Sequence, residues 1–210
     1  MKKQNRFSGF FGYEGGFSYY TGKLFDIMAV SLFWLLGSLF IVTAGTSFSA
    51  LYAAASRSIR QDAEPFSSRF LKSYGQNLKT GIPLWLLFLG VVFLLLLNIG
   101  ILLKKMNTAF GWFFIVLYGA VILIAIMAAS YAFPALSRFE MPTGWFVKLS
   151  LYLTFRHIGI SLLLLLIFAA SYLLLLWQPL LAAFVPGAAN VLISKLIDPI
   201  LDQHMPKKEG

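Results

Sequence analysis

The pattern of hydrophobic and polar positions divides the chain into long uncharged segments separated by short charged ones. Three of the uncharged segments, 82–103, 110–135 and 158–177, contain 22, 26 and 20 residues. A helix needs about 20 apolar residues to cross a hydrocarbon core about 30 Å thick. A charge at the centre of such a helix costs about 2.5–3.5 kcal/mol on an insertion scale. The pattern therefore predicts three transmembrane helices over these residues.

A first apolar segment, 24–55, is longer than a single crossing requires. Its uncharged part, Ile27–Ala55, has 29 residues and would be about 43 Å long as a helix. The second half consists mostly of small residues, several of them at four-residue spacing, which lets helix backbones approach closely in a membrane. We therefore predict a helix-packing and partner interface made by Gly45, Thr46, Ser49, Ala50, Ala53 and Ala54.

A bend is expected within this segment at Thr43–Thr46, because glycine weakens a helix and threonine can bond back to the preceding turn. The alternative is one plain, long, tilted helix whose bend has no role. Near the C-terminus, residues 179–197 are apolar but interrupted by Pro186-Gly187. We expect a kinked fifth transmembrane helix there, and the alternative is a helix buried against the others.

These segments predict an all-α integral membrane protein with about five transmembrane helices in a single membrane domain, 1–210. Residues 1–23 are rich in Phe and Tyr, which favour the headgroup layer, so this segment is expected to lie along the membrane interface.

The charged segments between the spans predict amphipathic interfacial helices. Residues 66–79 place their aromatic and leucine side chains at spacings of three and four, which is typical of one helical face. Such a helix can lie on the bilayer and bind lipid phosphates, or it can dock another protein. The predicted cytoplasmic interfacial residues are Phe70, Lys72, Tyr74, Asn77, Lys79, Lys148 and Arg156.

Two short sequence matches between the halves of the chain suggest a two-fold internal repeat. The tetrapeptide Phe48–Leu51 recurs as Phe133–Leu136, and Phe70-Leu71-Lys72 recurs as Phe146-Val147-Lys148. Both halves would then contain a span, a cytoplasmic loop, an amphipathic helix and a second span, which is a parallel repeat. Because the matches are few and short, chance and common descent are both open explanations.

Composition supports a membrane location. The chain is 59% hydrophobic and 12% charged, with a mean hydropathy of +0.79, whereas soluble domains carry about 25% charged residues. The net charge of +9 fits basic loops near anionic lipid better than binding to nucleic acid. There are no cysteines, so neither disulfides nor thiolate metal sites can form.

The distribution of basic residues predicts the orientation. With five spans, segments 56–81 and 136–157 and the C-terminal tail share one side and hold eleven Lys and Arg residues, against six on the other side. The more basic side is normally cytoplasmic. We therefore expect a multi-pass protein of a bacterial cell membrane, with its N-terminus outside and its C-terminus in the cytoplasm.

No pattern for chemistry accompanies these segments. The sequence has no phosphate-binding glycine loop, no nucleophile elbow and no metal-ligand spacing around its histidines, and we predict neither catalytic residues nor cofactors nor a metal. The deepest polar residues expected in the spans are Asn98, Ser130, Tyr131 and Ser161, which suit interhelical hydrogen bonds. Since no charge lies mid-span, ion-coupled transport is disfavoured.

The region from Lys23 to Leu86 resembles the N-terminal signature of the YesL family of bacterial integral membrane proteins, a domain of unknown function. The resemblance rests on Asp26, on Trp34, on Val42-Thr43-Ala44-Gly45 with Ala50-Leu51-Tyr52, and on Phe70 through Lys79. The family usually has isoleucine where this chain has Ala44. The resemblance implies an association with uptake systems for plant-polysaccharide oligosaccharides, alongside ABC importer permeases, and it implies no catalytic residues.

Together, these observations predict an accessory membrane subunit of a carbohydrate ABC importer that contacts the permease subunits and the lipid bilayer. The alternatives are a stand-alone facilitator for a small solute and a membrane sensor component. Self-association and the identity of the sugar are left open.

Overall fold

The structure of the chain, a computed structural model, describes residues 16–61, 65–105 and 109–203. Within these ranges it contains helices and no strands, which confirms the predicted all-α class for the described residues. In chain order the elements are α1 (Gly16–Gly37), the 3-10 helix η1 (Ile41–Thr43), α2 (Ala44–Ala54), the π-helical turn η2 (Ala55–Arg60), α3 (Phe66–Lys105), α4 (Ala109–Leu136), α5 (Thr143–Arg156), α6 (Ile158–Trp177), the 3-10 helix η3 (Pro179–Ala183) and α7 (Val185–Asp202).

The first apolar segment, 24–55, is divided between two helices instead of forming one. The α1 helix ends at Gly37, and α2 begins at Ala44. The Thr43 hydroxyl donates hydrogen bonds to the carbonyls of Gly37, at 2.9 Å, and Phe40, at 3.0 Å. The bond to Gly37 satisfies a carbonyl that the end of α1 leaves without a partner within the helix. The expected bend is thus a complete break, which begins a few residues before Thr43.

Three helices of the described chain are long and apolar enough to cross a membrane, and they lie within Phe66–Lys104 of α3, Phe110–Leu136 of α4 and Ile158–Trp177 of α6. They contain the three uncharged segments from which spans were predicted. The prediction of about five spans is not confirmed, because among the described residues only these three helices are long and apolar enough to cross a membrane.

Residues 179–197 instead form η3 and most of α7, which match the alternative of a buried helix. The inner face of α7 carries Asn190, Ser194 and Asp198, all buried. Buried polar and charged groups need hydrogen-bonding partners, which hydrocarbon does not supply. Asp198 has such partners in α2, in η2 and just after α4, and the helix packs mainly against η2, α6 and α1.

The predicted interfacial helix 66–79 and the span 82–103 belong to the same helix. The α3 helix continues through 40 residues, with Pro83 inside it, and is therefore about 60 Å long. Leu84 is fully buried immediately after the proline, so protein contacts hold the helix at this point. The polar turns of α3 consequently extend the apolar turns along one axis.

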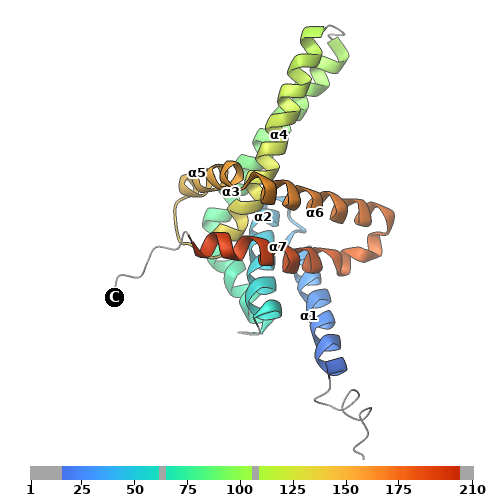
Figure 1. Ribbon diagram of the computed structural model, residues 1–210, viewed down its shortest axis with the longest axis vertical. Helices are drawn as coiled ribbons and strands as arrows, with labels where there is room; N and C mark the ends of the chain where they lie inside the picture. Colours follow the sequence, from blue (N-terminus) through green and yellow to red (C-terminus); the bar gives the residue numbers. More distant parts are fainter. Residues whose placement is uncertain (1–15, 62–64, 106–108, 204–210) are drawn as a thin grey trace, which may run out of the picture.

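The candidate spans do not form a parallel bundle. In Figure 1, α3 and α4 form a hairpin whose far end projects away from the other helices, whereas α6 runs across the molecule at the base of that hairpin. The α5 and α7 helices lie beside this base, and α1 leads away from it in the opposite direction to the hairpin.

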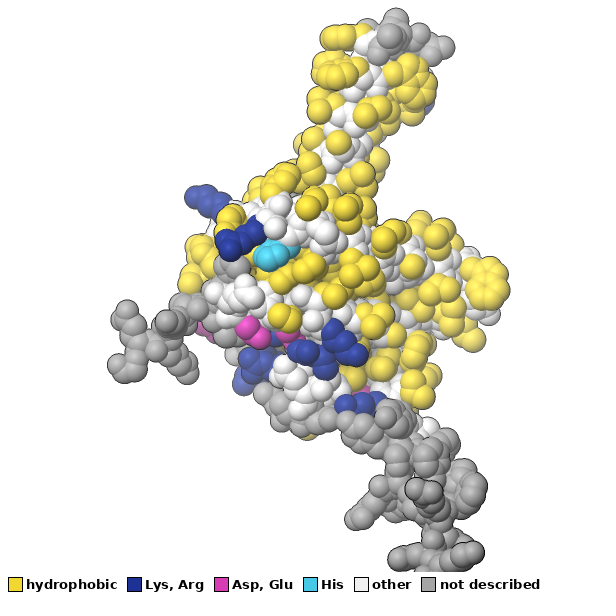
Figure 2. All heavy atoms as spheres, in the orientation of Figure 1, with side chains coloured by type: hydrophobic (Ala, Val, Ile, Leu, Met, Phe, Trp, Pro, Cys, Tyr) yellow, Lys and Arg dark blue, Asp and Glu magenta, His cyan; other side chains and the backbone are white. Residues whose placement is uncertain are grey.

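Apolar side chains cover the projecting helices. Figure 2 shows them over the α3–α4 hairpin and over α6, while the Lys and Arg side chains visible in this view gather below the hairpin. In the most apolar 18-residue stretch of each candidate span, the buried share is only 6% for α3, 17% for α4 and 11% for α6. Exposed apolar surface of this extent marks a membrane or protein contact, so the structure supports a membrane protein.

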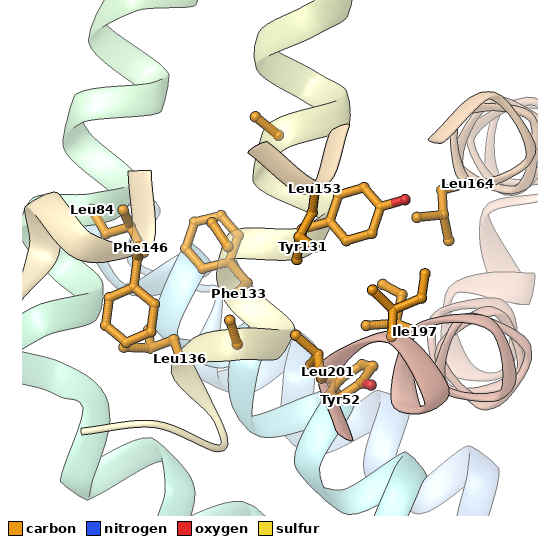
Figure 3. Packing of buried hydrophobic residues seen from close by; sticks show 14 of the residues in the cluster. Tyr52, Leu84, Tyr131, Phe133, Leu136, Phe146, Leu153, Leu164, Ile197 and Leu201 are labelled. Atoms are coloured by element: carbon orange, nitrogen blue, oxygen red, sulfur yellow. The ribbon is translucent and has the colours of Figure 1, made fainter. Parts of the chain in front are cut away.

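The hydrophobic core lies where the helices meet at the base of the hairpin (Figure 3). Phe133 of α4 is at its centre, with ring centroids 5.8 Å from Trp85 and 6.1 Å from Phe48. The largest fully buried side chains of this core are Tyr52, Leu84, Tyr131, Phe146, Leu153, Leu164, Ile193, Ile197 and Leu201. Residues from α2, α3, α4, α5, α6 and α7 thus share one core.

The proposed internal repeat is not confirmed. In the first half, the helix that carries Phe70 runs without interruption into the span. In the second half, α5 ends at Arg156, and His157, with φ −119° and ψ 50°, separates it from α6. The two halves therefore differ at the junction that the repeat would require them to share.

Candidate functional site

The small-residue face predicted as an interface is buried within the chain. All six of its residues, Gly45, Thr46, Ser49, Ala50, Ala53 and Ala54, are buried, chiefly against α3, α1 and α4. A Cβ atom added at Gly45 would lie 2.6 Å from the Cβ atom of Trp85, so glycine allows this close approach. Helix packing does occur here, but its partners are helices of the same chain, and the face is not available to another protein in this structure.

The predicted cytoplasmic interfacial residues fall into two groups, of which the aromatic one packs inward. Phe70 is only 2% exposed, and its ring centroid lies 5.6 Å from that of Phe33 in α1. Tyr74 stacks on Phe70 and donates a 3.4 Å hydrogen bond to the Gly37 carbonyl. These two rings therefore hold α3 against the end of α1 and do not face lipid.

The polar group remains at the surface. Asn77 donates a 3.2 Å hydrogen bond to the Ser73 hydroxyl, and Lys72 and Lys79 are exposed on the same part of α3. On α5, Lys148 is exposed, and Arg156 donates to the Tyr152 hydroxyl and lies over its ring. Of these four basic residues, Lys72 and Lys79 line one pocket, whereas Lys148 and Arg156 do not line it.

A polar pocket of about 690 Å³ lies beside the basic residues of α3. Its wall is formed by residues 69–80 of α3, by Arg57 of η2 and by residues 136–142, which follow the end of α4. Five of the lining residues are basic, and one, Glu140, is acidic. We refer to this cavity as the basic pocket.

A buried carboxylate, Asp198 of α7, lies next to the basic pocket. Its side chain is 4% exposed and forms ion pairs with Arg60 and Arg138. It also accepts hydrogen bonds from the Tyr52 hydroxyl, at 2.5 Å, and from the Ser56 hydroxyl, at 2.7 Å. Each carboxylate oxygen therefore receives one guanidinium and one hydroxyl, and together these four donors fill its hydrogen-bonding capacity.

The Asp198 cluster joins three parts of the chain that are far apart in sequence. Arg60 lies in the π-helical turn η2, an irregularity that is frequent at functional sites, and Arg138 follows the end of α4. Arg138 also bonds to Asp202, at 2.5 Å, and so links the basic pocket to α7. Burial raises the pKa of the Tyr52 phenol above its ordinary value despite the two nearby arginines. The phenol therefore stays protonated and donates a hydrogen bond to Asp198.

Sequence analysis did not identify this cluster. In the sequence, Arg60 and Arg138 are only two of the eleven basic residues that predict the orientation. The available signal was Asp198 on the same helical face as Asn190 and Ser194, at four-residue spacing, which is unusual in a segment expected to face lipid. The distribution of basic residues predicts that the segments with Arg60, Arg138 and Asp198 lie on one side of the membrane. The ion pairs join these three segments.

The polar residues expected within the spans do not converge on one site. The Tyr131 and Ser161 hydroxyls lie 3.1 Å apart and join α4 to α6. Ser130 donates to the Met127 carbonyl, and Asn98 is exposed and donates to the Leu94 carbonyl. Within the described ranges, no group of three or more His, Asp or Glu side chains is arranged to hold a metal ion.

Fold and surface define a helical protein with long, exposed apolar helices of membrane-spanning length. A family model described as "Protein of unknown function, DUF624" matches residues 27–99. The matched region runs from α1 to the outer turns of α3 and overlaps the residues of the resemblance described above. No curated protein and no solved structure matches the chain.

Proposed function

We propose that this protein is an accessory membrane subunit of a carbohydrate ABC importer and acts through helix–helix contact with the permease subunits. The importer and its sugar come from the resemblance to the YesL family, with which the match to the DUF624 model is compatible. The mode of action comes from the shape of the molecule.

The observation that carries this proposal is the exposure of the candidate spans. In α6, which has 20 residues, only Ser161 and Leu164 are buried. A self-contained bundle would cover more of such a helix with its own neighbours. Because α6 and the α3–α4 hairpin diverge (Figure 1), both leave lateral surface on which the helices of a partner can pack. This surface replaces the small-residue face of α2, which the chain itself covers.

Site-specific cross-linking in membranes that contain the permease pair tests the proposal. A photoreactive residue at Leu97 of α3 or at Leu166 of α6, both exposed, is expected to form adducts with a permease subunit. The matched control is Leu151 of α5, which is also exposed but lies outside the candidate spans.

We expect the affinity-tagged protein to co-purify with the permeases in mild detergent. A chain that never co-purifies with them, and whose adducts form equally from all three positions, would contradict the proposal.

A stand-alone facilitator is the second candidate, and the geometry gives it less support. An apolar cavity of about 290 Å³ at the base of the hairpin is lined almost entirely by apolar side chains, among them Phe88, Phe133 and Phe168. A polar solute would lose its hydration there without gaining hydrogen bonds. Solute uptake into vesicles that contain only this protein would nevertheless favour the facilitator.

A further inference from the structure

We propose that the basic pocket binds a phosphate group, and that its source is the headgroup of an anionic phospholipid. This site is separate from the apolar surfaces of the proposed permease contact and does not depend on that proposal.

The charges that line the basic pocket favour an anion. Arg57, Lys72 and Lys79 are exposed within it, whereas its acidic residue, Glu140, is outnumbered. Arg138 is held by Asp198 and Asp202, so its own charge is largely compensated and its guanidinium is fixed in position. An excess of positive charge therefore remains on the α3 and η2 walls.

The uncharged lining supplies further hydrogen-bond donors. The hydroxyls of Ser73 and Thr80 and the amides of Gln76 and Asn77 lie between the basic side chains. Phosphate offers several acceptor oxygens, and its usual protein partners are Lys, Arg and neutral donors of this kind. The composition of the pocket thus matches a phosphate better than a neutral or cationic ligand.

The position of the basic pocket selects the source of the phosphate. On α3, Lys79 and Thr80 line the pocket, and the uncharged stretch begins two residues later at Ile82. On α4, the pocket begins at Leu136, the last residue of that helix. The pocket therefore lies where both apolar helices become polar, which is the depth of lipid headgroups.

Apolar surface for the acyl chains continues along the same helix. Leu86 and Leu87 of α3, one to two turns beyond the pocket, are 45% and 44% exposed. A phospholipid with its phosphate in the basic pocket would extend its chains in this direction. Basic pockets between helices at the membrane surface bind anionic headgroups in this manner.

The test measures lipid binding by the full chain, purified in a neutral detergent, using native mass spectrometry with phosphatidylglycerol and phosphatidylcholine. We expect phosphatidylglycerol to bind and phosphatidylcholine to bind at least about tenfold more weakly, because each basic contact near a membrane surface is worth about 1 kcal/mol. The double variant K72Q/K79Q should weaken phosphatidylglycerol binding by at least about tenfold for the same reason, and K72R/K79R should retain it.

The matched control is K148Q/K195Q, which removes the same charge from α5 and α7 at two exposed lysines outside the pocket. Equal loss of binding in both Gln variants would indicate a diffuse charge effect and overturn the proposal. Competition by inorganic phosphate or glycerol phosphate as effectively as by the lipid would overturn the lipid assignment. Thermal unfolding of each variant separates loss of the site from loss of the fold. Retained binding by K72R/K79R would show that positive charge is needed at these two positions, and the comparison with K148Q/K195Q shows whether that charge must lie in the pocket.

Discussion

At the scale of single residues, two buried positions determine how the helices meet. Asp198 carries a charge into the protein interior, where it is stable only because two arginines and two hydroxyls bond to it. Gly45 lacks a side chain at the point where α2 passes closest to Trp85 and Phe133. The sequence does not reveal the neighbours of either residue, because those neighbours are distant along the chain.

Removal of the Asp198 carboxylate should destabilise the protein strongly. Asp198→Ala leaves Arg60 and Arg138 without their buried counter-charge, and breaking a buried pair in this way costs about 3–5 kcal/mol. Asp202→Ala is the matched control, since the Asp202 side chain is 57% exposed and exposed pairs contribute about 0–1 kcal/mol. Thermal unfolding in detergent should rank the two variants in this order, and equal melting temperatures would show that the cluster does not stabilise the fold.

A methyl group at Gly45 should also be costly. The added Cβ atom would lie 2.6 Å from the Cβ atom of Trp85 and 2.7 Å from the Cε1 atom of Phe133, and such overpacking typically costs about 1–3 kcal/mol. At Gly90 in α3, nothing lies within 4 Å of the added atom, so Gly90→Ala should be neutral or stabilising by up to about 1 kcal/mol. If Gly45→Ala melts at or above the temperature of Gly90→Ala, then α2 and α3 are not in close contact at this position.

At the scale of elements, the boundaries differ from those that hydropathy predicts. Hydropathy separates residues 66–79 from 82–103 because their polarity differs, yet hydrogen bonding continues from one to the other in α3. It also joins residues 24–55, although this segment contains the break between α1 and α2. Hydropathy reports how a segment is solvated, whereas helix continuity depends on backbone hydrogen bonds and on tertiary contacts.

A distance measurement tests the continuity of α3. Spin labels on cysteines that replace Leu71 and Leu89, both exposed, are 18 residues apart and thus five turns apart on one face. One continuous helix places their backbones about 27 Å apart. Double electron–electron resonance spectroscopy in detergent should give a single narrow distribution of distances between the two labels, near this value. A markedly shorter or broad distribution would indicate a separate helix that lies along the interface.

At the scale of the whole molecule, polar and apolar parts are separated along the α3–α4 hairpin. Its outer turns are apolar and exposed, and its base meets the basic pocket and the Asp198 cluster (Figure 2). A membrane protein needs this separation, because its apolar turns contact hydrocarbon and its polar residues contact headgroups and water. Lys72 of α3 and Lys148 of α5 are both exposed, and we expect them to lie on one side of the membrane.

Cysteine labelling in membrane vesicles tests this placement, and the natural chain contains no cysteine that would interfere. Cysteines replacing Lys72 and Lys148 should react with a water-soluble maleimide from one side only, which we expect to be the cytoplasmic side. Cysteines replacing Leu94 or Leu166, which are exposed apolar residues of α3 and α6, should be protected by lipid or by a partner. Reaction of Lys72→Cys and Lys148→Cys from opposite sides would refute the arrangement.

The sequence by itself determined that the long apolar helices suit a hydrocarbon environment. It also determined the positions of the three most apolar helices. Long uncharged runs such as 158–177 have one favourable environment, because backbone groups in hydrocarbon must be satisfied within a helix. Which segments share a side of the membrane stays a prediction from the distribution of basic residues.

Only the tertiary structure decided that the small-residue face of α2 is covered by the chain itself, that α7 is a buried helix and that Asp198 unites η2, α4 and α7. These features depend on contacts between residues up to 156 positions apart. The local pattern along a chain records the polarity of each segment but not the identity of its neighbours. The partner of a small, hydroxylated or charged side chain is therefore established only when the helices pack.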